Sequence, residues 1–264
     1  MICDFHAHLY DEDGYAEALA ETARTLGIDK VCIGAGEAWH GIASNETVLE
    51  EAARYPDLFV PIAYLRLGRD GPDDVMRLNE SGFRGLKVLA PLAPYDDVAF
   101  FPVYDAAQAL ELPILFHTGM LPATHLDRAF DVRSDRMRPV LLDTVARQFP
   151  ALTVVGGGLG WPWYEEAAEL LNLHGNVYFD LSGATLRKRG LEFFSALLGA
   201  PQATLLERPR HGAACRRLLF GSGARHERIA EIECDYERLF RSMDLGQEVV
   251  EGIMGDTAAD ILEM

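Results

Sequence analysis

The sequence predicts an α/β fold, a (β/α)8 TIM barrel, with residues 1–264 forming a single domain. Short apolar segments bounded by turn residues recur roughly every 25–35 residues, as parallel βαβ units require. Amphipathic helical patterns fill the intervals between them. No internal repeat, low-complexity tract or linker divides the chain, and 49% of its residues are hydrophobic. These features favour one large core.

Each expected strand is an apolar run that ends at a glycine, a proline or a polar residue. The expected strands are Ile2–His6, Lys30–Ala35, Leu58–Leu65, Gly85–Leu89, Pro113–His117, Leu152–Gly156, Val177–Leu181 and Arg217–Gly221. Strand 4 is closed by Pro91 and Pro94, and strand 5 leads into an irregular loop at 118–135. A loop of that length in a compact domain is often functional.

The expected helices alternate with these strands. The first, Tyr15–Leu26, has Leu19, Ala20 and Ala23 on one face and Gly27 as its stop signal. The second, Asn45–Arg54, has Asn45 as its expected N-cap. The others are Asp73–Ser81, Phe101–Leu110, Arg138–Gln148, Trp163–Leu173, Leu191–Leu198, Arg228–Arg241 and Gln247–Ile253. Residues Gly199–Ala214 are expected to form an extended loop before strand 8.

The composition of the chain limits the kinds of partner that we expect the protein to bind. The net charge is −17, which argues against nucleic acid and gives no reason to expect an anionic membrane. We find neither a signal peptide nor a membrane-spanning apolar stretch, so we expect a cytoplasmic protein. The four cysteines have no C-x-x-C spacing, and Cys3 and Cys32 fit small buried positions. We expect a small-molecule substrate, with a homodimer as a further expectation.

The stretch Asp4-Phe5-His6-Ala7-His8 is the first candidate site. On a strand, alternate side chains share a face, so His6 and His8 point the same way. Two imidazoles at a strand end can hold one divalent metal. Asp4 is expected on the same face, where it could orient a ligand. The alternative is two polar residues at an ordinary strand-to-loop junction.

Other polar residues stand at the expected carboxyl ends of strands, where barrel active sites lie. His117 directly follows an apolar strand, which favours a site role over packing. Lys87 lies within strand 4, where we favour an ion-pair partner over a carbamylated metal ligand. Arg66 and Arg69 could anchor substrate charge, the alternative being ordinary solvation. The remaining candidates are Glu37 after strand 2, Asp180 and Ser182 at strand 7, and His226 after strand 8.

Seven segments together resemble the amidohydrolase-related family of metal-dependent hydrolases, in its aminocarboxymuconate-semialdehyde decarboxylase-like branch. They are residues 4–8 (DFHAH), 82–87 (GFRGLK), 113–119 (PILFHTG), 159–162 (LGWP), 177–183 (VYFDLSG), 217–222 (RLLFGS) and 253–258 (IMGDTA). The resemblance implies a barrel of the metallo-dependent hydrolase type with one divalent metal, most often zinc. It also implies that His6, His8 and His117 are the metal ligands.

The chain departs from the family pattern at two positions. Gly158 stands where the family has a histidine that acts on the metal-bound water or the substrate. Gly223 stands where the family has an aspartate that binds the metal and often shares in proton transfer. Three histidines can still hold zinc, whereas a lost acid or base typically costs about 10²–10⁴-fold in rate. Glu37, Asp180 and His226 are the candidates to take over proton transfer.

Two functions from different classes follow. The first is a metal-dependent hydrolase or non-oxidative decarboxylase that acts on a small carboxylic or lactone-like molecule with a degraded site. The second is a catalytically inactive barrel that binds a ligand or a partner protein, which the glycine pair favours. A weaker third reading is an oligomeric structural subunit. Metal content and activity on esters, lactones and carboxylates discriminate the first two.

Overall fold

The expected strands form one parallel sheet. In a computed structural model, which describes residues 1–37, 40–199 and 214–264, eight strands pair in chain order. They are β1 (Cys3–His8), β2 (Lys30–Gly34), β3 (Phe59–Leu65), β4 (Gly85–Val88), β5 (Ile114–His117), β6 (Val154–Gly157), β7 (Val177–Asp180) and β8 (Leu218–Leu219). The predicted (β/α)8 TIM barrel of the metallo-dependent hydrolase type is confirmed.

Backbone hydrogen bonds close the sheet between its two ends. The N–H of Phe5 in β1 donates to the carbonyl of Phe220, just after β8, at 2.9 Å. The N–H of Gly223 donates to the carbonyl of His6 at 2.6 Å. The sheet is thus nearly closed, and the chain after β8 lies against the histidine-bearing strand.

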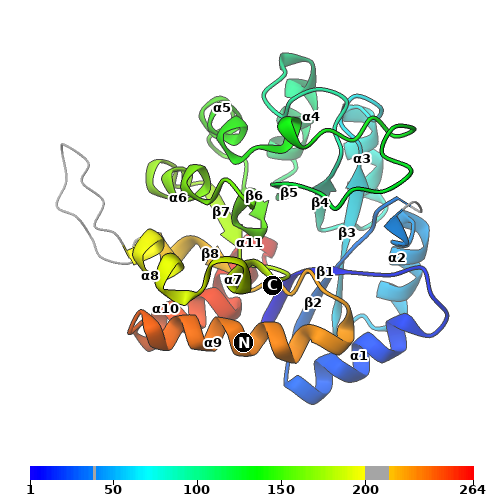
Figure 1. Cartoon of the computed structure of the whole chain (residues 1–264). Coiled ribbons are helices and arrows are strands. Elements are labelled where there is room, and N and C mark those ends of the chain that lie inside the picture. The colour runs from blue at the N-terminus through cyan, green and yellow to red at the C-terminus, as the bar shows by residue number, and fades with distance from the viewer. Residues whose placement is uncertain (38–39, 200–213) are drawn as a thin grey trace.

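Helices cover the outside of the barrel (Figure 1). The α-helices of the described residues are α1 (Tyr15–Leu26), α2 (Asn45–Arg54), α3 (Pro72–Glu80), α4 (Phe101–Ala109), α5 (Leu142–Gln148), α6 (Tyr164–Leu173), α7 (Thr185–Arg189), α8 (Leu191–Gly199), α9 (Ile229–Ser242), α10 (Gln247–Glu251) and α11 (Thr257–Leu262). Helix α1 ends at Gly27 with φ 70°, as its sequence predicts. No helix of the described residues is both long and apolar enough to cross a membrane.

Three expected helix features differ. The N-cap of α2 is Ser44, whose side chain accepts from the N–H of Thr47, while Asn45 bonds the backbone of Tyr64 instead. Helix α5 begins at Leu142 rather than at Arg138, because Arg138 precedes a proline and is held extended. The short helices α7 and α11 were not predicted. The loop expected at Gly199–Ala214 lies, between its two end residues, outside the described residues.

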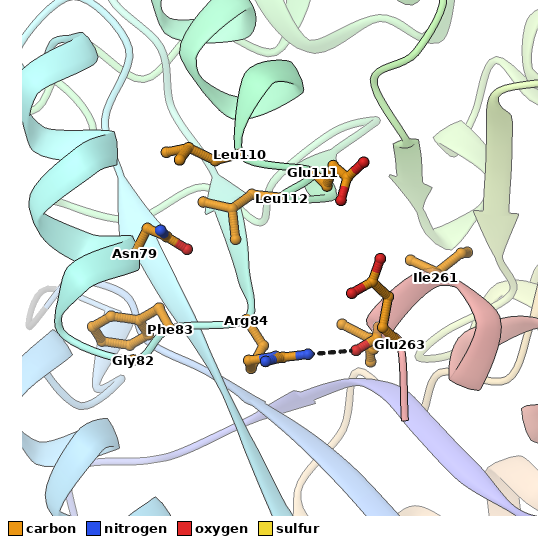
Figure 2. Close-up of a pocket in the computed structure, with 10 residues that line it drawn as sticks. Asn79, Gly82, Phe83, Arg84, Leu110, Glu111, Leu112, Ile261 and Glu263 are labelled. Carbon is orange, nitrogen blue, oxygen red and sulfur yellow. Dashed lines mark hydrogen bonds between the residues drawn. The ribbon is translucent and has the colours of Figure 1, made fainter.

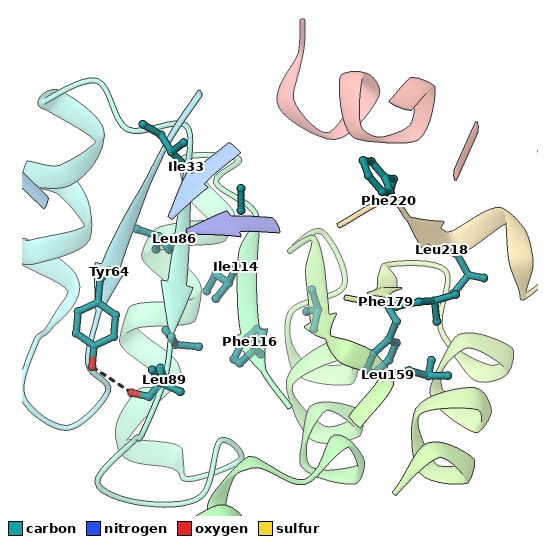
Figure 3. Packing of buried hydrophobic residues seen from close by; sticks show 14 of the residues in the cluster. Ile33, Tyr64, Leu86, Leu89, Ile114, Phe116, Leu159, Phe179, Leu218 and Phe220 are labelled. Atoms are coloured by element: carbon teal, nitrogen blue, oxygen red, sulfur yellow. Dashed lines mark hydrogen bonds between the residues drawn. The ribbon is translucent and has the colours of Figure 1, made fainter. Parts of the chain in front are cut away.

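Apolar side chains fill two layers. The larger layer lies between strands and helices and includes Ile33, Leu86, Phe116 and Phe179 (Figure 3). The smaller one lies inside the barrel and includes Phe5, Cys32, Val60, Ile62, Leu115, Val155 and Leu219. Ala258 and Leu262 of α11 join this inner layer, so the last helix closes the amino-terminal end of the barrel. Cys3 and Cys32 are buried, as expected.

The long loop at 118–135 lies at the carboxyl-terminal end of the barrel. The buried Arg66, just after β3, donates to the carbonyl of Phe130 in this loop and to that of Ala90 after β4. The N–H of Met120 donates to the carbonyl of Trp161, after β6, at 2.8 Å. These partners all follow strand ends. The loop therefore lies at the mouth of the barrel.

Candidate functional site

A polar layer lies directly above the inner apolar layer. On four strands the residue two positions after an inner apolar residue enters this layer: His117 after Leu115, Gly157 after Val155, Asp180 after Tyr178 and Gly221 after Leu219. Lys87 in β4 pairs in register with Leu115 of the apolar layer, and its amine contacts His6 and His8 in the polar layer. The site therefore sits at the carboxyl ends of the strands, where barrel enzymes place their chemistry.

Strand β1 reaches this layer through a shift in its pairing. The register of β1 against β2 slips between Asp4 and Ala7. Phe5 belongs to the inner apolar layer, and yet His6 and His8 both contact Lys87 inside the barrel. A bulge of this kind re-aims side chains next to active sites. The prediction that His6 and His8 share one face is confirmed, although simple alternation does not describe the whole strand.

Asp180 holds the ring of His6. Its Oδ2 accepts from His6 Nδ1 at 2.7 Å, and its Oδ1 accepts from the N–H groups of Gly158 (2.6 Å) and Ser182 (2.9 Å). Burial alone would raise the pKa of Asp180, but the neighbouring His6 and these hydrogen bonds outweigh it and lower the pKa. Asp180 is thus a buried, ionised carboxylate with all its described partners on one side of the mouth.

This hydrogen bond fixes the tautomer of His6. Because Asp180 accepts the proton of Nδ1, we assign the lone pair of His6 to Nε2. That Nε2 lies 3.2 Å from the Nζ of Lys87, and Nδ1 of His8 lies 2.8 Å from the same Nζ. The two rings meet edge to face, with centroids 5.0 Å apart. The Lys87 amine therefore lies between two imidazoles: it donates to Nε2 of His6 and lies against the ring of His8, 3.4 Å from that ring's Nε2.

Lys87 is almost fully buried, at 3% exposure. Burial lowers its pKa from 10.5 to about 7, and the charge of Asp180 opposes part of this shift. No carboxylate of the described residues forms an ion pair with it. Among the described residues the partners of Lys87 are imidazoles, so its expected role as an ion-pair partner stays a prediction. A lysine without a counter-ion in this layer is the main feature that sequence reasoning missed.

The other imidazoles are held neutral. Burial, and after it the charge of Lys87, lowers the pKa of His8 well below its ordinary value and that of His117 to about 3. The Nε2 atom of His117 is buried and has no hydrogen-bond partner among the described residues. Burial and Lys87 also lower the pKa of His40, a residue that the sequence analysis did not single out. The orphaned nitrogen of His117 is a place for a ligand atom.

Two glycines make room for the His6–Asp180 pair. A Cβ at Gly157 would lie 3.1 Å from Cε1 of His6. A Cβ at Gly221 would lie 2.9 Å from Cβ of His6 and 3.0 Å from Cβ of Asp180. All three distances are shorter than ordinary contacts, and those at Gly221 are the most severe because they involve Cβ atoms. Glycine at these positions is a packing requirement of the polar layer.

Gly158 and Gly223 lie beside Ser182, and the two are not equivalent. A Cβ at Gly158 would meet Oγ1 of Thr185 at 3.5 Å, an ordinary contact. A Cβ at Gly223 would lie 2.6 Å from Cβ of Ser182 and 2.9 Å from its Oγ. Both glycines have positive φ, +66° and +51°. The side chain of Ser182 thus takes the space that a side chain at position 223 would need.

The remaining sequence candidates lie away from this layer. Glu37 accepts from Arg69 at 2.5 Å at the rim. His226 packs against α1, with its ring 5.2 Å from that of Tyr15 and its Nδ1 3.3 Å from the hydroxyl of Thr22. In the described residues, no hydrogen bond joins either of them to the polar layer. Arg66 is bonded to backbone carbonyls, so its visible role is to hold the loop at 118–135.

Asp4 is hydrogen-bonded to the backbone of two chain segments. Its Oδ1 accepts from the N–H of His6 at 3.1 Å and from that of Ser222 at 2.8 Å, so it ties β1 to the chain after β8. Burial raises its pKa. It makes no hydrogen bond to an imidazole ring in the described structure, so the expectation that Asp4 orients a ligand is not met. Asp180 does this instead.

The residues as arranged do not fit a divalent metal. No three His, Cys, Asp or Glu side chains of the described residues are gathered closely enough to hold one. The Lys87 amine lies 3.2 Å from Nε2 of His6 and 2.8 Å from Nδ1 of His8, in the space that a shared cation would need. A metal at His6, His8 and His117 requires Lys87 to leave first.

A separate pocket lies at the other end of the barrel (Figure 2). It has a volume of about 210 Å³ and is lined by residues that precede strands β4 and β5 and by the end of α11. Arg84 there donates to the carbonyl of Leu262 at 2.8 Å. Its lining contains no residue of the polar layer, so the candidate site is the mouth and not this pocket.

Solved structures share the fold. An uncharacterized TIM-barrel protein from Bordetella bronchiseptica has a TM-score of 0.74 at 19% identity, over 99% of this chain and 98% of that one. A probable 2-pyrone-4,6-dicarboxylic acid hydrolase from Acinetobacter baumannii, with citric acid bound, has 0.66 at 13%, over 100% and 99%. A dihydroxybenzoic acid decarboxylase from Polaromonas sp. JS666, with bound manganese and the inhibitor 2-nitroresorcinol, has 0.62 at 16%, over 99% and 96%.

The family is shown by sequence. No curated protein was found to be similar to this chain. The model of the amidohydrolase family matches residues 3–264, which is almost the whole length. This match agrees with the resemblance found in the seven sequence segments. The chain belongs to the amidohydrolase family.

Proposed function

We propose that the protein is a hydrolase or non-oxidative decarboxylase that acts on a small carboxylic or lactone-like molecule at the barrel mouth. The observation that carries this proposal is the polar layer of His6, Lys87 and Asp180, built at the carboxyl ends of the strands of an amidohydrolase barrel. Two neighbours in fold, at low identity, are named for a dicarboxylic acid hydrolase and a benzoic acid decarboxylase. Both names describe acidic substrates.

The chemistry proposed for each residue follows its contacts. Asp180 holds His6 with its Nε2 lone pair toward the mouth, which suits that nitrogen to accept a proton. Lys87 supplies positive charge to a substrate oxygen. His8 and His117, both neutral, supply hydrogen bonds. Among the proton-transfer candidates from the sequence, Asp180 has contacts that support a role, while for Glu37 and His226 the role stays a prediction.

A divalent metal, most simply zinc, held by His6, His8 and His117 also stays a prediction. It is the expectation of the family resemblance, and the manganese of the Polaromonas structure is consistent with it for that protein. The position of the Lys87 amine speaks against it in this chain as the residues are arranged. We therefore assign no step of the reaction to a metal.

The second candidate function is an inactive barrel that binds a ligand. The observation that favours it is the glycine pair at 158 and 223, where the family resemblance leads us to expect a histidine and an aspartate. Ser182 already fills the space beside Gly223. In this reading the polar layer still binds a small acid but lacks the groups that turn it over.

Turnover of purified protein on a panel of lactones and hydroxybenzoates, with and without added Zn²⁺ and Mn²⁺, tests the proposal. We expect hydrolysis or loss of CO₂ for at least one compound, and about 10–100-fold less turnover in Asp180→Asn. Asp57→Asn, an exposed aspartate before β3, is the control. Turnover that Asp180→Asn leaves intact would place the chemistry elsewhere, and a complete absence of turnover would favour the binding function.

A further inference from the structure

We propose that the Lys87 amine replaces a metal as the cation of the mouth, and that it binds the carboxylate of a small organic acid together with His117. This inference deepens the proposed function, because it concerns the same site and names how its acidic ligand is held. It also differs from what the family resemblance implies for the three histidines.

The Lys87 amine lies where a metal shared by His6 and His8 would have to bind. Nζ of Lys87 lies 3.2 Å from Nε2 of His6 and 2.8 Å from Nδ1 of His8. The same Nζ lies 3.4 Å from Nε2 of His8, so the amine meets Nε2 of His6 at its lone pair and lies against the ring of His8. A metal ion between these rings would need the lone pair of His6 and the same space. The amine and a metal therefore exclude one another.

Among the described residues, the Lys87 amine has unsatisfied charge and unused hydrogen-bond donors. Lys87 is buried, and no carboxylate of the described residues pairs with it. Buried charges in folded proteins are normally paired, so the protonated amine needs an anion in contact with it. An ammonium has three protons, and the lone pair of Nε2 on His6 accepts one of them. The remaining donors are left for a ligand.

His117, on the neighbouring strand β5, has a ring nitrogen that can bind the same ligand. Nε2 of His117 on β5 is buried without a described partner. The charge of Lys87 acts on this ring and lowers its pKa, so the ring lies within electrostatic reach of the amine. β5 neighbours β4, the strand of Lys87. A carboxylate has two oxygens, and one can accept from Lys87 while the other meets His117 in its Nε2–H form.

Asp180 does not already fill this role. Its oxygens accept from His6, Gly158 and Ser182, and it bonds Nδ1 of the His6 ring, whereas Lys87 contacts Nε2 of that ring. It reaches the amine through the imidazole and not directly. The arrangement carboxylate–imidazole–amine leaves the positive end facing the mouth, where the neutral His8 and His117 add no competing charge.

Binding of benzoate, with benzamide as the uncharged analogue of the same shape, tests the carboxylate site. The protein is first treated with a chelator, and titration calorimetry is run on wild type, Lys87→Met and Lys30→Met. Lys30 lies at the opposite end of the barrel, where it donates to the carbonyl of Asp57. We expect wild type and Lys30→Met to prefer benzoate, and Lys87→Met to bind it about 10–100-fold more weakly. Equal binding of benzoate and benzamide by wild type would overturn the proposal.

Zinc binding tests the exclusion of metal. Titration of wild type and Lys87→Met with Zn²⁺ should give a higher affinity for the variant, because both imidazole lone pairs become available. Histidine ¹⁵N resonances of wild type provide a readout that needs no variant: added benzoate should perturb them, and stoichiometric Zn²⁺ should not. Tight coordination of zinc by the wild-type histidines would overturn the proposal.

Failure of this inference and failure of the proposed function give different results. Turnover that persists with no preference for benzoate leaves the enzyme but removes the carboxylate site. Benzoate binding through Lys87 without any turnover leaves the site but favours the binding function. The two sets of measurements are therefore independent.

Discussion

Gly221 faces His6 so closely that a Cβ at position 221 would lie 2.9 Å from the Cβ of His6. The same atom would lie 3.0 Å from the Cβ of Asp180. Both contacts involve Cβ atoms, which cannot move without the backbone. The hydrogen bond between His6 and Asp180 thus depends on a glycine that comes from a third strand end, next to β8.

Gly221→Ala should therefore destabilise the protein by about 1–3 kcal/mol, the usual cost of overpacking a closed core. Chemical denaturation measures the change in the free energy of unfolding. Gly175→Ala is the matched control, because a Cβ there meets nothing within 4 Å. A Gly221→Ala variant as stable as this control would show that the two strands separate more easily than the contacts indicate.

Gly223→Asp alone should also destabilise the protein, because the new Cβ would lie 2.6 Å from that of Ser182 and φ is +51°. Adding Ser182→Gly should recover part of the loss, since the backbone N–H that bonds Asp180 remains. A double-mutant cycle of unfolding free energies measures this coupling. Additive effects of the two substitutions would contradict the proposed clash.

The substitutions Gly223→Asp and Ser182→Gly should also change the affinity for a divalent metal. From the sequence alone, Gly223→Asp should raise affinity for a divalent metal, because an ionised carboxylate attracts the cation. In the structure this gain is expected only when Ser182→Gly makes room. Titration of the single and double variants with Zn²⁺ checks the point, and a gain in the single variant would show that Ser182 moves aside freely.

The stability of the protein should depend on pH through Lys87. Its pKa is about 7 in the folded protein, against 10.5 for a free lysine, because burial penalises the ammonium. Between these values the unfolded chain binds more protons, so stability rises with pH over this window. Relative to Lys87→Met, wild type should therefore gain stability from pH 7 toward pH 10. Denaturation curves at several pH values measure the difference, and a difference that stays constant would contradict the lowered pKa.

Asp180→Asn should reverse the tautomer of His6. The new amide can still accept from the N–H groups of Gly158 and Ser182, but its NH₂ group then faces Nδ1 of His6. His6 would carry its proton on Nε2, which would face the amine of Lys87 as a second donor. Histidine ¹⁵N shifts report the tautomer directly. An unchanged Nδ1–H form in the variant would mean that Asp180 does not set it.

The barrel could be predicted because its signal is repeated eight times. Each strand gives an apolar run, and the helices α1 and α2 begin and end at the expected residues. Predictions from single residues failed where a neighbouring residue, in the chain or in space, determined the conformation. Arg138 is extended because a proline follows it, and Asn45 serves the backbone of Tyr64 rather than the cap of its own helix.

The site could be predicted only in part. Strand ends placed His6, His8, His117 and Asp180 at one mouth, since parallel strands share their carboxyl ends. The contacts between them depend on a register shift in β1 and on the direction of one long lysine side chain. Neither leaves a mark in the sequence beyond the polar residue between Leu86 and Val88.

The Lys87 amine, and not a metal, is proposed to lie between His6 and His8. A crystal structure of protein grown with excess zinc, with anomalous data collected at the zinc edge, tests this placement. We expect Nζ of Lys87 within hydrogen-bond distance of ring nitrogens of both imidazoles and no anomalous peak between them. A zinc peak bound by His6, His8 and His117, with Lys87 turned away, would contradict it.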